Sequence, residues 1–96
     1  MPFARVADFE ADEEAIEKFV AMIQSDPTPP DGVPATGINV LANRAESRMR
    51  VVVFFDSEEA LQAGNAILEQ MNPPDDLAVR RVNVDLFEVL VQQQAT

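Results

Sequence analysis

The segment from residue 48 to residue 91 constrains the fold of this chain most strongly. It holds a strand-like run, RMRVVVFFDS, then an amphipathic helical pattern, EEALQAGNAILEQM, and then a second alternating run, RRVNVDLFEVLV. Residues 51–55 are apolar at every position, so a strand here would be apolar on both faces. Because one layer of helices covers one face of a sheet, the pattern predicts that the other face binds a ligand or meets a second copy of the chain.

The first half of the chain repeats this order of elements. Residues 3–9 are predicted to form a strand, and Ile16, Phe19, Val20 and Ile23 have the i, i+3, i+4, i+7 spacing of one helical stripe. A further strand and the segment described above complete a βαββαβ pattern. The sequence therefore predicts an α+β fold in which the first and third strands are central and the second and fourth lie at the edges.

Local signals set the expected boundaries. Asp12 is predicted to cap the first helix, which ends before Asp26. The proline-rich stretch 27–34 cannot continue a helix or pair within a central strand, so we predict an ordered loop that forms a lid or rim over the open end of the sheet. Residues 37–44 are predicted to form the second strand, and the turn 45–47 joins it to the third as a hairpin.

The second helix is predicted to start with Asp56 or Ser57 as its cap and to end at residues 72–74. Glycine in a helix costs about 1 kcal/mol relative to alanine, so Gly64 predicts a close approach of this helix to the sheet. In the last strand the apolar phase changes between Leu86 and Phe87, which predicts a bulge or a change of neighbours. The predicted buried stripe of the second helix consists of Ala60, Leu61, Gly64, Ile67, Leu68 and Met71.

Composition limits the possible functions. The length of 96 residues predicts a single domain, residues 1–96, with 92–96 as a frayed tail. Seventeen acidic and seven basic residues give a net charge of −10, which argues against nucleic acid and anionic membranes as partners. No apolar run is long enough for a membrane span or a signal peptide, so we expect a cytoplasmic protein.

The chain contains no His, Cys, Trp or Tyr. This excludes thiolate metal sites and leaves the serines and threonines without a histidine to activate them. We therefore expect no metal site and no cofactor, and the sequence does not indicate whether the protein is an enzyme.

Five arginines are predicted to gather at one end of the sheet, because the hairpin tip and the start of the last strand meet there. They could bind a carboxylate or a phosphate. Alternatively, they pair with neighbouring carboxylates and contact the carboxyl end of the second helix. The arginines are Arg44, Arg48, Arg50, Arg80 and Arg81, with Asp8, Glu10 and the acidic start of the first helix between them.

A second set of residues predicts a small-ligand pocket, because polar groups alternate with apolar and aromatic ones on the face opposite the helices. Alternatively, these groups satisfy one another or water across a dimer interface. The candidate ligand-binding residues are Asn39, Asn43, Asn83, Asp85, Arg5, Phe54, Phe55 and Phe87, of which Phe54 or Phe55 and Phe87 supply the aromatic neighbours.

Where RVVVFFDSEEALQAGNAILEQMNPP runs into RRVNVDLFEV, the chain resembles the dimeric α/β-barrel superfamily, in its antibiotic biosynthesis monooxygenase-like branch. The resemblance covers nearly the whole chain as a pattern and is specific over residues 50–89. It implies a ferredoxin-like monomer with a four-stranded antiparallel sheet and two helices on one face, which dimerises into an α/β barrel. The last strand often reaches over the partner in this family.

Family members include cofactor-independent oxygenases of aromatic polyketides and haem-degrading enzymes. These enzymes tend to use a strand Asn with a Trp, and the haem enzymes add an axial His. Asn39 or Asn43 could match the Asn, whereas the Trp and the His have no counterpart here, so haem is not expected as a natural cofactor.

Three hypotheses follow. The leading one is a homodimeric barrel that holds a small apolar or aromatic ligand between sheet and helices. The alternative is a cofactor-independent monooxygenase acting on an aromatic substrate, which Asn39, Asn43, Arg5 or Asp85 would orient. The third is a structural or stress-associated interaction domain. A roomy, partly apolar cavity reaching Asn39, Asn43 and Asn83 would favour binding or catalysis.

Overall fold

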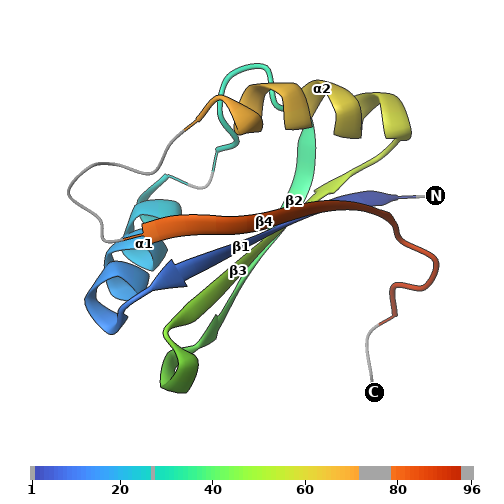
Figure 1. Cartoon of the computed structure of the whole chain (residues 1–96). Helices are drawn as coiled ribbons and strands as arrows, with labels where there is room; N and C mark the ends of the chain where they lie inside the picture. Colours follow the sequence, from blue (N-terminus) through green and yellow to red (C-terminus); the bar gives the residue numbers. More distant parts are fainter. Residues whose placement is uncertain (1, 27, 72–78, 94–96) are drawn as a thin grey trace.

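The computed structural model describes residues 2–26, 28–71 and 79–93 (Figure 1). Its strands form one four-stranded antiparallel sheet in the order β2-β3-β1-β4. The predicted βαββαβ order and the central position of the first and third strands are therefore confirmed. Along the chain the elements are β1 (Phe3–Ala11), α1 (Glu13–Ser25), β2 (Ala35–Asn43), the 3-10 turn η1 (Arg44–Glu46), β3 (Arg48–Phe55), α2 (Glu58–Glu69) and β4 (Val79–Glu88).

Side-chain caps begin both helices. The Asp12 carboxylate accepts the Ala15 N–H at 2.8 Å, and the Ser57 hydroxyl accepts the Ala60 N–H at 3.1 Å, so the predicted caps are confirmed and Ser57 is the second one. The predicted stop at residues 72–74 lies outside the described residues. Among the helices described, none is long and apolar enough to cross a membrane.

The core lies between the helices and one face of the sheet. Met49, Val51, Val53 and Phe55 alternate along β3 toward this face and belong to one buried cluster with residues of both helices. Phe55 is fully buried, and a Cβ added at Gly64 would lie 2.7 Å from its Cζ atom. The predicted close approach of α2 to the sheet is therefore confirmed.

The end of α2 and the loop before β2 differ in how they relate to the core. Met71 is exposed rather than buried, because it lies beyond the last turn of α2, which ends at Glu69. In the loop between α1 and β2, Val33 is buried in the core and its N–H donates to the Pro30 carbonyl at 3.0 Å. The loop is therefore anchored to the core over its last residues, while its function as a lid stays a prediction.

Strand β4 contains a bulge at Val82. Asp8 of β1 pairs with Asn83, whereas the next residue, Phe9, pairs with Arg81, so Val82 is one residue too many for the ladder. The extra residue reverses the alternation of β4: Arg81 shares the helix-facing side with Phe9, and Asn83 faces the other way. The bulge predicted at 86–87 is wrong in position, because pairing with β1 is regular from residue 83 to residue 88.

The end of the chain leaves the sheet after β4. The Val89 N–H donates to the Pro2 carbonyl at 2.9 Å, and Val91 is largely exposed. Residues 89–93 have no regular secondary structure, and residues 94–96 of the predicted tail lie outside the described residues.

Candidate functional site

The sheet face opposite the helices is here called the open face. Pairing registers divide it into four rows that cross β2, β3, β1 and β4 in that order. One end of the face is apolar and the other is charged. From the apolar end, the rows are Gly37, Phe54, Ala4 and Phe87; Asn39, Val52, Val6 and Asp85; Leu41, Arg50, Asp8 and Asn83; and Asn43, Arg48, Glu10 and Arg80.

Most candidate ligand-binding residues lie on this open face, but two do not. Phe55 points the other way and is buried in the core, so Phe54 is the aromatic residue of the open face. Arg5 also points toward the helices. The ligand-binding role of the residues that share the open face stays a prediction; they are Asn39, Asn43, Asn83, Asp85, Phe54 and Phe87.

Polar groups on the open face contact one another. The Asn83 amide donates to the Asp85 carboxylate at 2.7 Å, and Arg50 donates to both Asp8 oxygens at 2.6 and 3.3 Å. The hydrogen bond and charge of Asp8 raise the pKa of Arg50. The Asn43 side chain accepts a hydrogen bond from the Glu46 N–H at 3.2 Å, so Asn43 caps η1. These contacts lie within one chain, so the alternative in which the polar residues satisfy one another or water across a dimer interface stays a prediction.

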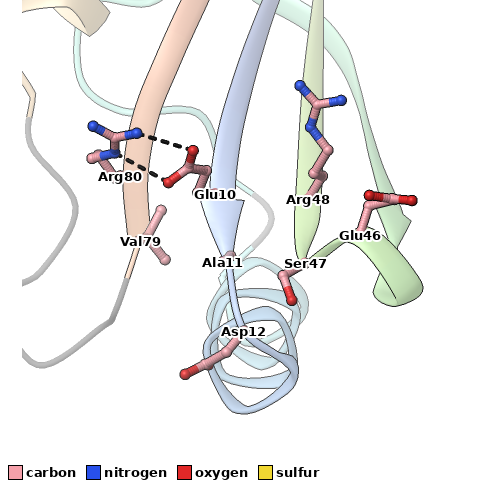
Figure 2. A pocket seen from close by; sticks show the side chains of 8 residues that line it. All are labelled: Glu10, Ala11, Asp12, Glu46, Ser47, Arg48, Val79 and Arg80. Atoms are coloured by element: carbon pink, nitrogen blue, oxygen red, sulfur yellow. Dashed lines mark hydrogen bonds and ion pairs between the residues drawn. The ribbon is translucent and has the colours of Figure 1, made fainter.

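A hollow of about 700 Å³ lies at the charged end of the sheet and is open to solvent (Figure 2). Within it Arg80 donates to both oxygens of Glu10, at 3.2 and 2.9 Å. The hydrogen bond and charge of Arg80 lower the pKa of Glu10. The hollow does not reach Asn39, Asn43 or Asn83; its lining residues are Glu10, Ala11, Asp12, Glu46, Ser47, Arg48, Val79 and Arg80.

Arg44, Arg50 and Arg81, near the same end, also have acidic partners. Arg44 of η1 contacts two glutamates of α1, Glu13 at 3.4 Å and Glu17 at 2.6 Å. Arg81 contacts both the carboxylate and the backbone carbonyl of Glu69 at 3.4 Å. The structure therefore contains ion pairs for four of the five arginines, and Arg81 contacts the carboxyl end of the second helix, in line with one of the two predicted interpretations. Across the described residues, no group of three or more acidic side chains could hold a metal ion.

The helix-facing side of β1 holds a buried charge that sequence patterns did not identify as a network. Arg5 is 5% exposed; its Nε donates to the Asn65 Oδ1 at 2.9 Å and its Nη2 to the Glu69 Oε1 at 3.3 Å. The second oxygen of Glu69 contacts Arg81 of β4 at 3.4 Å. Burial lowers the pKa of Arg5, against the opposing effect of Glu69. We call these four residues the Arg5 cluster.

Apolar side chains lie beside the Arg5 cluster. On β4 the direct partner of Arg5 is Leu86, and the partner of Ala7, two residues along β1, is Val84. Leu86 is 38% exposed although it is on the helix-facing side of the sheet. Helix α2 lies mainly over β1, β2 and β3, and it contacts β4 through Glu69 and Arg81. The β4 side of this face therefore combines a partly uncovered apolar surface with two guanidinium groups.

The fold matches solved structures along nearly its full length. MhuD, a haem-degrading protein from Mycobacterium tuberculosis whose structure has two haems in its active site, aligns with a TM-score of 0.68 and 20% identity over 96% of this chain and 99% of that chain. Rv0793 from the same organism aligns with a TM-score of 0.63 and 14% identity over 98% and 100%. A putative antibiotic biosynthesis monooxygenase from Chloroflexus aurantiacus aligns with a TM-score of 0.56 and 11% identity over 99% and 98%. No family model matches the sequence, and no curated protein does.

The residues of this chain do not fit haem as an iron-ligated cofactor. Haem iron is held in proteins by His, Cys, Met or Tyr, and the sequence has no His, Cys or Tyr. Met49 is fully buried in the core, where no ring can reach it, while Met22 and Met71 lie at exposed positions. A flat ring could therefore be held by packing and hydrogen bonds, without an iron ligand from these side chains.

Proposed function

We propose that this chain, which has the fold of the antibiotic biosynthesis monooxygenase-like branch of the dimeric α/β barrels, is a single-domain protein that forms a homodimer and binds a small apolar or aromatic ligand. The observation that carries the proposal is the match to MhuD over nearly all of both chains. The MhuD structures hold flat rings, two haems in one structure and two manganese porphyrins per active site in another. From this likeness we propose that the chain has a site for a flat ring but does not perform chemistry at a haem iron.

The open face supports the homodimer. Leu41 and Phe87 are 52% and 51% exposed there, and large exposed apolar side chains on one face favour association. The face is also electrically neutral in a chain of charge −10, so two copies can meet without like-charge repulsion. Its three positive and three negative side chains are Arg48, Arg50, Arg80, Asp8, Glu10 and Asp85.

Light scattering at micromolar concentration tests the dimer, and we expect twice the chain mass of 10.6 kDa. Phe87→Asp should shift the protein toward the monomer, since an unpaired charge buried at an interface costs several kcal/mol. Met22→Asp adds the same charge at an exposed position of α1 and serves as the control. A wild-type monomer at this concentration would contradict the homodimer.

We place the ligand between α2 and the β1–β4 side of the sheet, beside the Arg5 cluster. This side offers the exposed side chain of Leu86 and the partly buried side chain of Val84, whereas in this proposal the open face binds the second copy. The competing location is the open face itself, where Asn39, Asn83 and Asp85 were predicted to bind the ligand.

Titration with a neutral aromatic probe, 2-naphthalenemethanol, distinguishes the two locations. Leu86→Trp adds bulk to the proposed surface and should weaken binding about tenfold, equivalent to roughly 1.4 kcal/mol. Asn39→Ala should have no effect. The reverse result would place the ligand on the open face, and no binding by the wild type at millimolar probe would refute the ligand site.

The second candidate function is a cofactor-independent monooxygenase, favoured by the likeness to the putative monooxygenase from Chloroflexus aurantiacus. In this hypothesis the anion of an electron-rich phenol reacts with oxygen while protein groups orient it. An oxygen electrode tests it directly: oxygen uptake with such a phenol should exceed the rate without protein and fall in Arg5→Met. Uptake that is the same with and without protein excludes this activity for the phenol used.

A further inference from the structure

We infer that the bound ligand carries a carboxylate, which binds across Arg5 and Arg81 at the position that the Glu69 carboxylate occupies in this structure. The inference rests on the proposed ligand site and names the chemical class of its ligand: an aromatic or aliphatic carboxylate.

The Arg5 cluster carries more positive than negative charge. Burying a guanidinium is costly unless an anion and further acceptors compensate it. Among the described residues, the Arg5 cluster holds two guanidiniums and one carboxylate, which leaves one positive charge in a chain of charge −10. The carbonyl end of α2 offsets part of this charge, because the Glu69 carbonyl lies 3.4 Å from Arg81. The remaining positive charge therefore attracts an anionic ligand to the cluster while Glu69 is still in place.

The Glu69 carboxylate is held only weakly by the two guanidiniums. Its contacts with Arg5 and Arg81 measure 3.3 and 3.4 Å, longer than the 2.7–2.9 Å typical of charge-assisted hydrogen bonds. Its side chain is 44% exposed, and it is the last residue of α2, where helix ends fray. Glu69 can swing into solvent as a ligand carboxylate takes its place, so that the buried guanidinium of Arg5 keeps an anionic partner throughout the exchange.

Apolar side chains of β4 lie next to the Arg5 guanidinium. Leu86 is the direct cross-strand partner of Arg5, and Val84 follows on the same side of β4. A ligand with a carboxylate on the guanidiniums would lay its remaining atoms along these apolar side chains. An inorganic anion would contact only the guanidiniums. An apolar carboxylate would contact both the guanidiniums and the apolar side chains of β4.

The experiment compares 2-naphthoate with the neutral 2-naphthalenemethanol on the full chain, by fluorescence titration at pH 7. Glu69→Gln removes the competing carboxylate and should tighten 2-naphthoate binding about tenfold without changing the binding of the alcohol. Arg81→Met should weaken 2-naphthoate binding by a similar factor, and Arg5→Met by at least as much. The matched control is Glu17→Gln, which removes the same charge from an exposed ion pair with Arg44 and should change neither affinity.

Circular dichroism of each variant shows whether the fold is intact. If Arg5→Met does not fold, Arg81→Met still tests the inference, because the Arg81 side chain is partly exposed. Unchanged or weaker 2-naphthoate binding in folded Glu69→Gln overturns the inference, since Glu69 then serves only to fasten α2 to the sheet. If the alcohol binds as tightly as 2-naphthoate in every variant, the ligand site stands and the carboxylate inference is wrong. Binding of neither probe by the wild type overturns both proposals.

Discussion

Replacing Gly64 by alanine should destabilise the protein, although alanine is the better helix former. Helix propensity favours alanine by about 1 kcal/mol. The added Cβ, however, would lie 2.7 Å from the Cζ atom of Phe55, a ring that is fully buried and cannot swing into solvent. Overpacking a filled core costs about 1–3 kcal/mol, and the rigidity of this ring favours the upper end. We expect a net loss of about 2 kcal/mol, or a fall in Tm of about 8–16 °C.

Thermal and urea unfolding at fixed protein concentration measure this effect, because the stability of a dimer depends on its concentration. Ala66→Gly, at an exposed position of the same helix, is the matched control and should lose only the propensity of about 1 kcal/mol. Phe55→Leu should make room for the methyl group. In a double-mutant cycle we therefore expect Gly64→Ala to cost about 1–2 kcal/mol less in the Phe55→Leu background.

A Gly64→Ala variant as stable as the wild type would refute this reasoning. So would additive effects in the cycle, because Gly64 would then not be required by contact with Phe55. Either result would mean that α2 lies farther from the sheet than the contact between Gly64 and Phe55 implies.

Three further predictions concern pH, haem and the loop. Arg80 lowers the pKa of Glu10 from its ordinary value of 4.5. This ion pair therefore stabilises the fold above pH 4.5, and the stabilisation is lost as the pH falls through the lowered pKa. Arg80→Met should return the pKa of Glu10 toward 4.5 in an NMR titration. Haem titration should give no stoichiometric complex with a shifted Soret band below micromolar concentration, and such a complex would show that the iron finds a ligand here. Replacing residues 28–34 by a Gly-Ser link should lower Tm strongly, because Val33 belongs to the core, whereas an unchanged Tm would show that the loop is a passive connector.

The elements that could be predicted from sequence are those specified by neighbouring residues. Asp12 and Ser57 act on backbone groups three residues away, so a short motif is enough to identify a cap. The unbroken apolar run of residues 51–55 likewise indicates a strand with two apolar faces, and Gly64 indicates a close approach of α2 to the sheet. Strand order followed from the βαββαβ pattern, because few connections of that pattern are compatible with one sheet.

The Arg5 cluster could not be predicted in the same way. Arg5 lies 60 residues from Asn65 and 64 from Glu69, and nothing local to either segment specifies the contact. On the helix, Asn65 and Glu69 have the i, i+4 spacing of an ordinary exposed face. The one available signal was an arginine in a strand otherwise rich in apolar residues. The bulge was misplaced for a related reason: Val82 has the sequence phase of Val84, but Val82 is itself the unpaired residue of the ladder.

The bulge at Val82 has a consequence for how this chain can change over evolution. Deleting the codon for Val82 would restore a regular ladder and would leave the other residues of β4 on their present faces, because Arg81 and Asn83 already pair with adjacent residues of β1. Arg81 would stay beside Glu69, and Asn83 and Phe87 would stay on the open face. The spacing between Arg81 and Phe87 can therefore shorten by one residue in evolution without exchanging the helix-facing side and the open face of β4.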